Sequence, residues 1–249
     1  MRALVISDIH GNLQALEAVL AAAEAVDQVW NLGDTVGYGA NPNEVTDIIR
    51  RVATVNVRGN HDRVCCGLTS SQGFNPVAAE AAAWTHRTLT PENLQWLREM
   101  PKGPVAATVR AMCAHGSPLH EDHYIVSMRD AWTPLQRMQT EITFFGHTHV
   151  QGGFSQREAE WEEDRPQYVG QDGAEQATIL VPEGTRHLIN PGSVGQPRDC
   201  DWRAAFAIYD DGVEEITFYR IPYDVAAAQA AIRAASLPER LAARLSIGR

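Results

Sequence analysis

Short apolar runs alternate with amphipathic stretches near the start of the chain. Residues 3–6 form an apolar run, and apolar side chains then recur at helical spacing in residues 13–20. The alternation returns as an apolar run at 29–32, a helical stretch at 44–49 that follows a proline start signal, and a run at 52–57. Repeated strand and helix units are typical of parallel strands joined by helical crossovers. Ligands gather beyond the carboxyl ends of such strands, so we expect functional side chains there.

The pattern changes in the middle of the chain. Residues 76–100 are predicted to be helical, with a second helix start near Thr90-Pro91, and we expect them to cover one face of the sheet. Asp210-Asp211-Gly212 is a hairpin signal. Further strands, without long helices between them, are predicted at residues 105–113, 141–145, 187–189, 204–209 and 214–219. A second, largely antiparallel sheet is therefore expected in the latter half.

Two segments of the latter half have unusual composition. Residues 158–175 are dense in acidic side chains and are predicted to form an exposed loop or a strand extension. Residues 224–249 begin with Ala-rich sequence and are predicted to form terminal helices broken at Pro238. A chain of 249 residues is long enough for one large α/β domain, and we expect residues 1–249 to form it.

Charge and cysteine usage narrow the class of protein. A formal net charge of −10 would repel a polyanion over most of the surface, which argues against broad nucleic-acid binding but leaves room for a small anionic substrate. The four cysteines show no C-x-x-C spacing and are expected to be reduced thiols of a cytoplasmic protein. No segment approaches the roughly 20 apolar residues that cross a bilayer, so no membrane partner is expected.

Metal-ligand side chains follow the apolar runs. The stretches are Asp8-Ile9-His10, Gly33-Asp34, Gly59-Asn60-His61-Asp62, His115-Gly116 and Gly146-His147-Thr148-His149. Residues two apart in an extended segment point to the same side, so each D-x-H or H-x-H pair can serve one site. Carboxylate, imidazole and carboxamide together suit manganese, iron, zinc, cobalt or nickel. One such stretch alone would indicate an ordinary capping or packed histidine, but several at strand ends favour a metal site. Ordinary roles are expected first for His86, His120, His123 and His187.

These stretches resemble a known family. In the same order, D-x-H, G-D, G-N-H-D/E, H-G and G-H-x-H form the signature of the calcineurin-like metallophosphoesterases. The segment Asn190-Pro191-Gly192-Ser193-Val194-Gly195 further resembles the small bacterial and archaeal phosphodiesterase branch. The resemblance implies a four-layer α/β/β/α fold, in which two β-sheets form a sandwich flanked by helices. It also implies two divalent transition-metal ions, manganese foremost, with iron, zinc, nickel or cobalt as alternatives.

The resemblance also implies roles for individual residues. Asp8, His10 and His149 would hold the first metal, Asn60, His115 and His147 the second, and Asp34 would bridge both. A metal-bridging hydroxide would attack the phosphorus of a small, nucleotide-like phosphate ester. His61 would face the substrate and donate a proton to the leaving oxygen.

Four further residues have two readings each. Asp62 is predicted either to orient His61 or raise its pKa, or merely to cap the following segment. Ser193 lies in a loop whose amides could bind an anionic oxygen or simply close a tight turn. Arg198 could hold a phosphate or be an ordinary surface arginine. Tyr38 could line the substrate entrance or pack within its loop. His120, His123 and Tyr124 share that last pair of readings.

Competing functions differ in what they require. Gly37-Tyr38-Gly39 departs from the G-D-x-V-D-R-G pattern of the protein phosphatase branch, which lowers the prospect of phosphoprotein phosphatase or diadenosine tetraphosphatase activity. A non-catalytic metal-binding scaffold, the role attributed to the retromer subunit of this superfamily, has no need of His61 together with every ligand. A nuclease is disfavoured by the acidic surface. The leading hypothesis is a metal-dependent phosphodiesterase or phosphatase.

Overall fold

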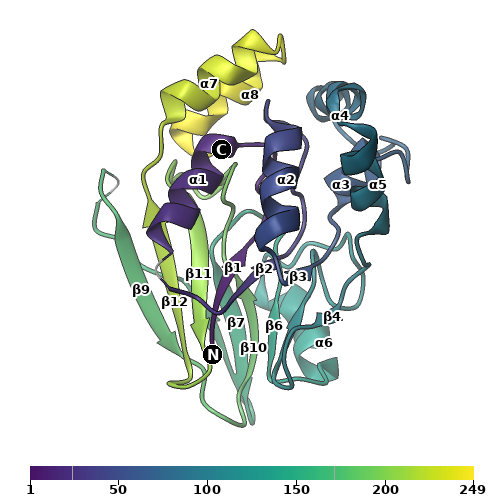
Figure 1. Ribbon diagram of the computed structural model, residues 1–249. Helices are drawn as coiled ribbons and strands as arrows, with labels where there is room; N and C mark the ends of the chain where they lie inside the picture. Colours follow the sequence, from purple (N-terminus) through teal and green to yellow (C-terminus); the bar gives the residue numbers. More distant parts are fainter. Residues whose placement is uncertain (24, 171) are drawn as a thin grey trace.

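Two six-stranded sheets pack face to face between helices in the computed structural model, which describes residues 1–23, 25–170 and 172–249 (Figure 1). The first sheet has the order β3 (Val55–Asn56), β2 (Gln28–Asn31), β1 (Arg2–Ile6), β11 (Ala204–Asp210), β12 (Glu215–Ile221), β9 (Glu175–Leu180). The second has the order β4 (Val105–Ala106), β5 (Ala111–Cys113), β6 (Ile142–Phe144), β10 (Arg186–Asn190), β7 (Gly152–Arg157), β8 (Glu160–Asp164). The predicted two-sheet sandwich is confirmed.

Helices cover the outer face of each sheet. They are α1 (Leu13–Ala22), α2 (Pro42–Val52), α3 (Asn60–Cys65), α4 (Pro76–Thr88), α5 (Pro91–Glu99), α6 (Met128–Arg137), α7 (Val225–Ala234), α8 (Glu239–Ala243) and the 3-10 helix η1 (Arg244–Ile247). The starts of α4 and α5 follow capping signals in the sequence, since Asn75 and Thr90 each accept a hydrogen bond from a first-turn amide. Among the described helices, none is long and apolar enough to span a bilayer.

The burial of β1 on both faces explains its unbroken apolar sequence. Leu4 and Ile6 pack in the cluster beneath the outer helices α1, α2 and α7. Ala3 and Val5 point the other way, into the layer between the sheets. A strand covered on both faces has no polar side to alternate with. On the far side, Leu135 of α6 packs against the second sheet, which completes the four layers.

The sheet partners of the C-terminal strands correct the sequence-based expectation. The expected second sheet is present, and three of its five strand pairings are antiparallel. The strand β11, however, does not belong to it, because β11 pairs antiparallel with β1 and thereby extends the first sheet. The second sheet keeps a parallel centre, since β6 pairs parallel with both β5 and β10. Periodicity predicts that a segment is extended, but its partner is chosen by long-range packing.

Several element boundaries also differ. Residue 52 ends α2, so the strand expected at 52–57 shrinks to β3. The single strand expected at 105–113 is two short strands, β4 and β5, which pair with each other. The helices α4 and α5 pack mainly against α2 and α3, and Ala78 and Ala81 of α4 belong to the same buried cluster as β1. The acidic segment 158–175 contains β8, so the strand-extension alternative is correct there. The helix break at Pro238 is confirmed, because Pro238 is the N-cap of α8.

The fold brings the motif loops to one edge. The strands β1, β2 and β3 run parallel, as do β5 and β6, and each is followed within a few residues by one of the metal-ligand stretches. The carboxyl ends of these strands therefore deliver their loops to a common place, as expected for parallel strands.

Candidate metal centre

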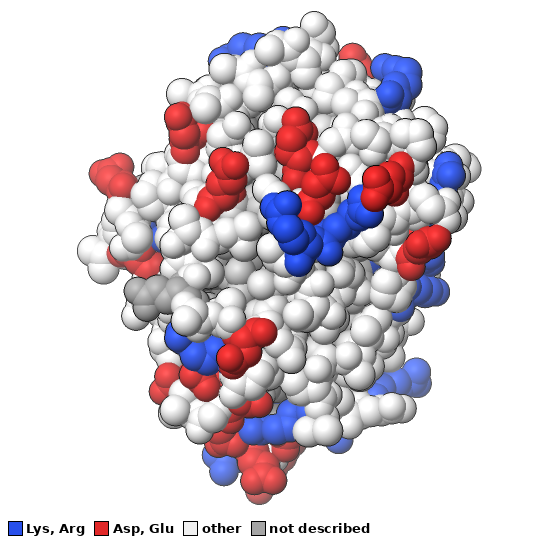
Figure 2. Space-filling model, in the orientation of Figure 1, with Lys and Arg blue, Asp and Glu red and all other residues white. Residues whose placement is uncertain are grey.

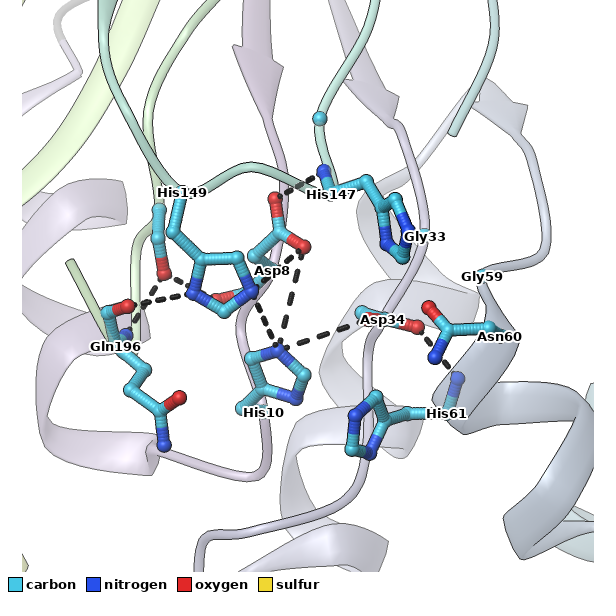
Figure 3. A network of polar contacts seen from close by, with 12 residues as sticks. Asp8, His10, Gly33, Asp34, Gly59, Asn60, His61, His147, His149 and Gln196 are labelled. Carbon is cyan, nitrogen blue, oxygen red and sulfur yellow. Dashed lines mark hydrogen bonds and ion pairs between the residues drawn. The ribbon is translucent and has the colours of Figure 1, made fainter. Parts of the chain in front are cut away.

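Two groups of buried ligand side chains meet at this edge, and both include Asp34. Asp8, His10, Asp34 and His149 form the first group, and Asp34, His115 and His147 form the second. Within each group the candidate ligand atoms lie within 4.8 Å of one another. Figure 3 shows these loops converging on the space between Asp8 and Asp34. The predicted convergence of the motifs is therefore present in the structure.

Short distances connect the members of the first group. His149 Nε2 lies 3.2 Å from Asp8 Oδ1 and 3.2 Å from His10 Nε2. His10 Nε2 lies 3.7 Å from Asp34 Oδ2. Asp8 Oδ1 is buried and receives no hydrogen bond. A carboxylate oxygen without a donor, beside imidazole nitrogens that face each other, is the arrangement that a cation would satisfy.

The second group is built around His115. Its Nε2 lies 3.4 Å from Asp34 Oδ2, 3.1 Å from His147 Nδ1 and 3.2 Å from Asn60 Oδ1. Asn60 thus joins this group with a carboxamide oxygen, as predicted. Oxygen and imidazole donors without thiolates fit a divalent transition metal in both groups.

Carbonyl groups orient three of the imidazole rings. His10 Nδ1 lies 3.2 Å from the carbonyl oxygen of Val36, and His115 Nδ1 lies 2.9 Å from that of Leu32. His149 Nδ1 lies 2.6 Å from the carbonyl oxygen of Gln196. A carbonyl only accepts, so each Nδ1 carries a proton and each Nε2 is the ring nitrogen that faces the site.

Electrostatics keep most of the ligands in the form that binds a cation. Burial lowers the pKa of His10 and His149, and it lowers the pKa of His147 to about 3. Burial lowers the pKa of His115, but the Asp34 carboxylate and its hydrogen bond outweigh burial and raise this pKa to about 9. The pKa of Asp34 itself is raised by burial but brought well below its usual value by His115 and His61. Asp34 is therefore a carboxylate at neutral pH.

The backbone is strained where the ligands are. Asp8, His10, Asp34, His147 and His149 have φ angles of +53°, +51°, +53°, +67° and +60°. Residues other than glycine rarely adopt this left-handed region, and each one that does costs about 1 to 3 kcal/mol. Strain of this kind persists where surrounding structure enforces it and is typical of functional sites.

His61 lies beside the ligand groups without joining them. Its backbone amide donates to Asp34 Oδ1 at 2.8 Å, whereas its ring Nδ1 is buried without a hydrogen-bond partner. The ring packs between Tyr38 and Phe74, with centroid distances of 4.4 and 4.5 Å. Burial lowers the pKa of His61 to about 4. This position agrees with the predicted non-ligand role.

Asp62 contacts backbone amides and not the His61 ring. It accepts from the amides of Asp34 at 2.8 Å, Gly59 at 2.9 Å and Val36 at 3.2 Å. Burial, and then the charge of Asp34, raise the pKa of Asp62 to about 7, while the backbone hydrogen bonds oppose that rise. Of its two predicted roles, the hydrogen bonds support capping. The catalytic assignment of Asp62 stays a prediction.

Ser193 forms hydrogen bonds within its own loop region. Its side chain is fully buried, donates to the carbonyl oxygen of Asp8 at 2.7 Å and accepts from the amide of Gln196 at 2.8 Å. Both contacts support the alternative of a turn that closes the loop, and the substrate contact of Ser193 stays a prediction. Through these bonds the turn supports Asp8 and the carbonyl of Gln196, on which His149 rests.

A cavity of about 640 Å³ opens above the ligand groups. It is lined by Asp34, Asn60, His61, His147, His149, Tyr38, Tyr124, Arg198, Gly73, Phe74, Asn75, Pro76, Val77, Ala78, Arg240, Leu241 and Arg244. Arg198 and Tyr38 therefore lie where substrate-binding residues are expected. Tyr124 stacks on the His147 ring at 4.0 Å, whereas His120 and His123 stack on each other and do not line this cavity.

Several cavity residues were not singled out by the sequence, among them one aromatic residue and two arginines. Phe74 follows a region without a motif, and Arg240 and Arg244 belong to the terminal helices, for which only packing was expected. The spacing of four residues between the two arginines indicates that they share a helix face. That spacing alone does not show whether the shared helix face lines a cavity or points into solvent.

Comparisons with known proteins agree with this geometry. An uncharacterized protein of Methanocaldococcus jannaschii is 35% identical over 257 residues, which span 98% of this chain and 97% of that protein. The crystal structure of a metallophosphoesterase from Sphaerobacter thermophilus is 41% identical, with a TM-score of 0.84 over 100% of this chain and 99% of that one. The symmetrical bis(5'-nucleosyl)-tetraphosphatase of Erwinia tasmaniensis is 28% identical over 120 residues, or 46% of this chain and 44% of that protein.

A family model gives the most general match. The model of the calcineurin-like phosphoesterase superfamily domain matches residues 1–211, which include every candidate ligand. The matched residues also include His61. The chain therefore belongs to the calcineurin-like phosphoesterase superfamily.

Proposed function

We propose that this protein is a dinuclear metal-dependent hydrolase of small phosphate esters, a phosphodiesterase or phosphatase acting on nucleotide-like substrates. The observation that carries the proposal is the position of Asp34, which belongs to both ligand groups beneath the same cavity. A pair of divalent cations held there would supply a nucleophile at neutral pH and neutralise phosphoryl oxygens. The partial match to a bis(5'-nucleosyl)-tetraphosphatase supports a phosphate ester as substrate.

His61 is the proposed proton donor. Its ring lines the cavity, and its Nδ1 has no hydrogen-bond partner. Burial disfavours the charged imidazolium, but the negative charge of a bound phosphate favours it. A proton held on this ring can then pass to the leaving oxygen when the ester bond breaks.

Arg198 is the proposed ligand of a nonbridging phosphate oxygen. It lines the same cavity, and its positive charge lowers the pKa of both His61 and His149. Its Nε is buried without a hydrogen-bond partner. A guanidinium can hold two phosphate oxygens at once, which would fix the phosphate over the ligand groups.

A metal and substrate screen tests the proposal. Metal-free protein is loaded in turn with Mn, Fe(II), Co, Ni or Zn, and hydrolysis of bis-p-nitrophenyl phosphate, p-nitrophenyl phosphate, cyclic nucleotides and DNA is measured. We expect turnover of small esters, with manganese the first metal to test, and little turnover of DNA because of the net charge of −10. Absence of turnover with every metal would instead favour the non-catalytic scaffold.

The surface supports a small substrate over a polyanion. Acidic and basic side chains are interspersed on the face that carries α1 and α2, and the described residues form no broad basic stripe across that face (Figure 2). Broad binding of a nucleic-acid backbone needs such a stripe. A small substrate partner and a cytoplasmic location stay predictions.

A further inference from the structure

Three arginines line the cavity above the ligand groups. Arg198 lies in the loop after β10, and Arg240 and Arg244 lie in α8 and η1. The terminal helices α7 and α8 pack beside α1 at one end of the molecule (Figure 1). The last segment of the chain thus contributes two positive charges to a wall of the cavity whose floor comes from the metal-ligand loops.

These arginines differ in their partners from several other arginines of the protein. Arg203 is paired with Asp201 and Glu175, and Arg63 with acidic side chains of a neighbouring loop. In the part of the chain that the structure describes, no Asp or Glu side chain forms an ion pair with any of the three arginines that line the cavity. Positive charges collected without carboxylate partners raise the local potential for an anion, even in a chain with a net charge of −10.

Arg198 and Arg244 each contact neighbouring groups of the protein. Arg198 donates one terminal nitrogen to Gln196 Oε1 at 3.1 Å. The guanidinium of Arg244 lies over the Tyr38 ring, 5.9 Å from its centroid, and its Nε donates to the main-chain oxygen of Arg249. Burial, and then the charge of Arg198, lower the pKa of Arg244 to about 10. Like charges that line one cavity cost free energy unless an anion lies between or beside them.

One phosphate does not account for the whole arrangement. The backbone amide of Arg198 donates to the carbonyl oxygen of His149 at 3.2 Å, which places Arg198 beside the reacting phosphate of the proposed function. The Arg244 guanidinium instead lies over the Tyr38 ring. A cavity of about 640 Å³ is the size of pockets that hold whole small molecules rather than a single phosphate group.

We propose that Arg240 and Arg244 form a second anion subsite, which binds a phosphate group of the substrate other than the one that is hydrolysed. The inference rests on the proposed function and names its substrate class, a nucleotide with phosphate groups at two positions. Phe74 and the half-exposed ring of Tyr124 line the same cavity and offer aromatic surface to a base.

A matched pair of substrates tests the subsite. Thymidine 5'-(p-nitrophenyl phosphate) and its 3'-phosphorylated counterpart have the same leaving group and base, and differ only in the second phosphate. With the metal-loaded enzyme, we expect kcat/KM to be about tenfold or more higher for the 3'-phosphorylated substrate, the effect of one or two charge-assisted hydrogen bonds. In Arg240→Gln/Arg244→Gln we expect kcat/KM for the 3'-phosphorylated substrate to fall about tenfold more than kcat/KM for the substrate without the second phosphate.

A second double variant controls for the change in charge. Arg51→Gln/Arg129→Gln removes the same two charges from exposed positions that do not line the cavity, and it should leave both activities unchanged. Equal losses on both substrates in the Arg240 and Arg244 variant, or no wild-type preference for the second phosphate, would overturn the subsite. If that double variant does not fold, Arg240→Gln alone carries the test, because its side chain is exposed.

Failure of the proposed function is recognised separately. If neither substrate is turned over with any metal, binding of thymidine 3',5'-bisphosphate to the metal-free protein is measured by calorimetry. Tight binding that weakens about tenfold in Arg240→Gln/Arg244→Gln, but not in the control variant, supports the subsite without catalysis. Absence of binding, or equal binding by both variants, overturns it.

Discussion

Asp62 Oδ2 accepts a hydrogen bond of 2.8 Å from the backbone amide of Asp34, the residue that belongs to both ligand groups. Because Asp62 also accepts from the amides of Gly59 and Val36, one buried carboxylate joins the start of α3 to the loop after β2. The geometry of the candidate metal centre thus depends on a residue outside both ligand groups.

Replacing Asp62 should therefore destabilise the protein strongly. In Asp62→Ala three buried amides lose their acceptor, and we expect the free energy of unfolding to fall by about 3 kcal/mol. Asp130→Ala is a matched control, since Asp130 occupies the same capping-box position at the start of α6 but is exposed, and its loss should cost about 1 kcal/mol. Urea unfolding measures both. Equal costs would contradict the joining role of Asp62.

Metal content should separate His61 from Asp34. His61→Ala is expected to lower kcat about 100-fold or more while both metals stay bound, because the ring lies outside the ligand groups. Asp34→Asn should reduce the metal content of both groups, since its carboxylate is common to them. Elemental analysis after dialysis measures both variants. Metal loss in His61→Ala, or full metal content in Asp34→Asn, would reverse the assignment.

Gly37 should control the position of the His61 ring. Gly37 has a φ of +89°, and a Cβ there would lie 2.7 Å from His61 Nδ1. In Gly37→Ala we expect kcat to fall about tenfold or more with the metals retained, because a misplaced donor loses reach to the leaving group. Gly184→Ala is the control, with a φ of +81° and no atom within 4 Å of the added Cβ. Both variants should lose about 1 kcal/mol of stability, but only Gly37→Ala should lose activity.

His187 should make the stability of the protein depend on pH. It is buried in β10, both ring nitrogens lack hydrogen-bond partners, and burial lowers its pKa to about 4. The unfolded chain therefore binds more protons than the folded protein between pH 6.5 and about 4, so this contribution is present above pH 6.5 and is lost as the pH falls. Between pH 7 and 4.5, wild-type protein should lose about 2 to 3 kcal/mol more than His187→Leu. Urea unfolding measures the free energy of unfolding of both proteins across this pH range. Parallel curves for wild type and His187→Leu would contradict the role of His187.

Much of the candidate metal centre was predictable because its signals are local. Each apolar run ends in a loop with specific ligand side chains, and parallel strands bring such loops to one edge. Helix starts were predictable for the same reason, since Thr90 caps α5 within its own first turn. The tendency of 204–209 to form a strand is equally local, and β11 is found there.

What the sequence determined by itself was the identity of the candidate ligands, the strand ends that carry them and the presence of His61 in one of the same motifs. Tertiary structure alone decided that β11 pairs with β1, that Asp62 turns to backbone amides, and that Ser193 is buried. It also decided that Arg240 and Arg244 line the cavity. The physical reason is that local conformation depends on residues that are neighbours in the sequence. By contrast, which group pairs with a strand edge, a carboxylate or a guanidinium depends on packing between segments far apart in the chain.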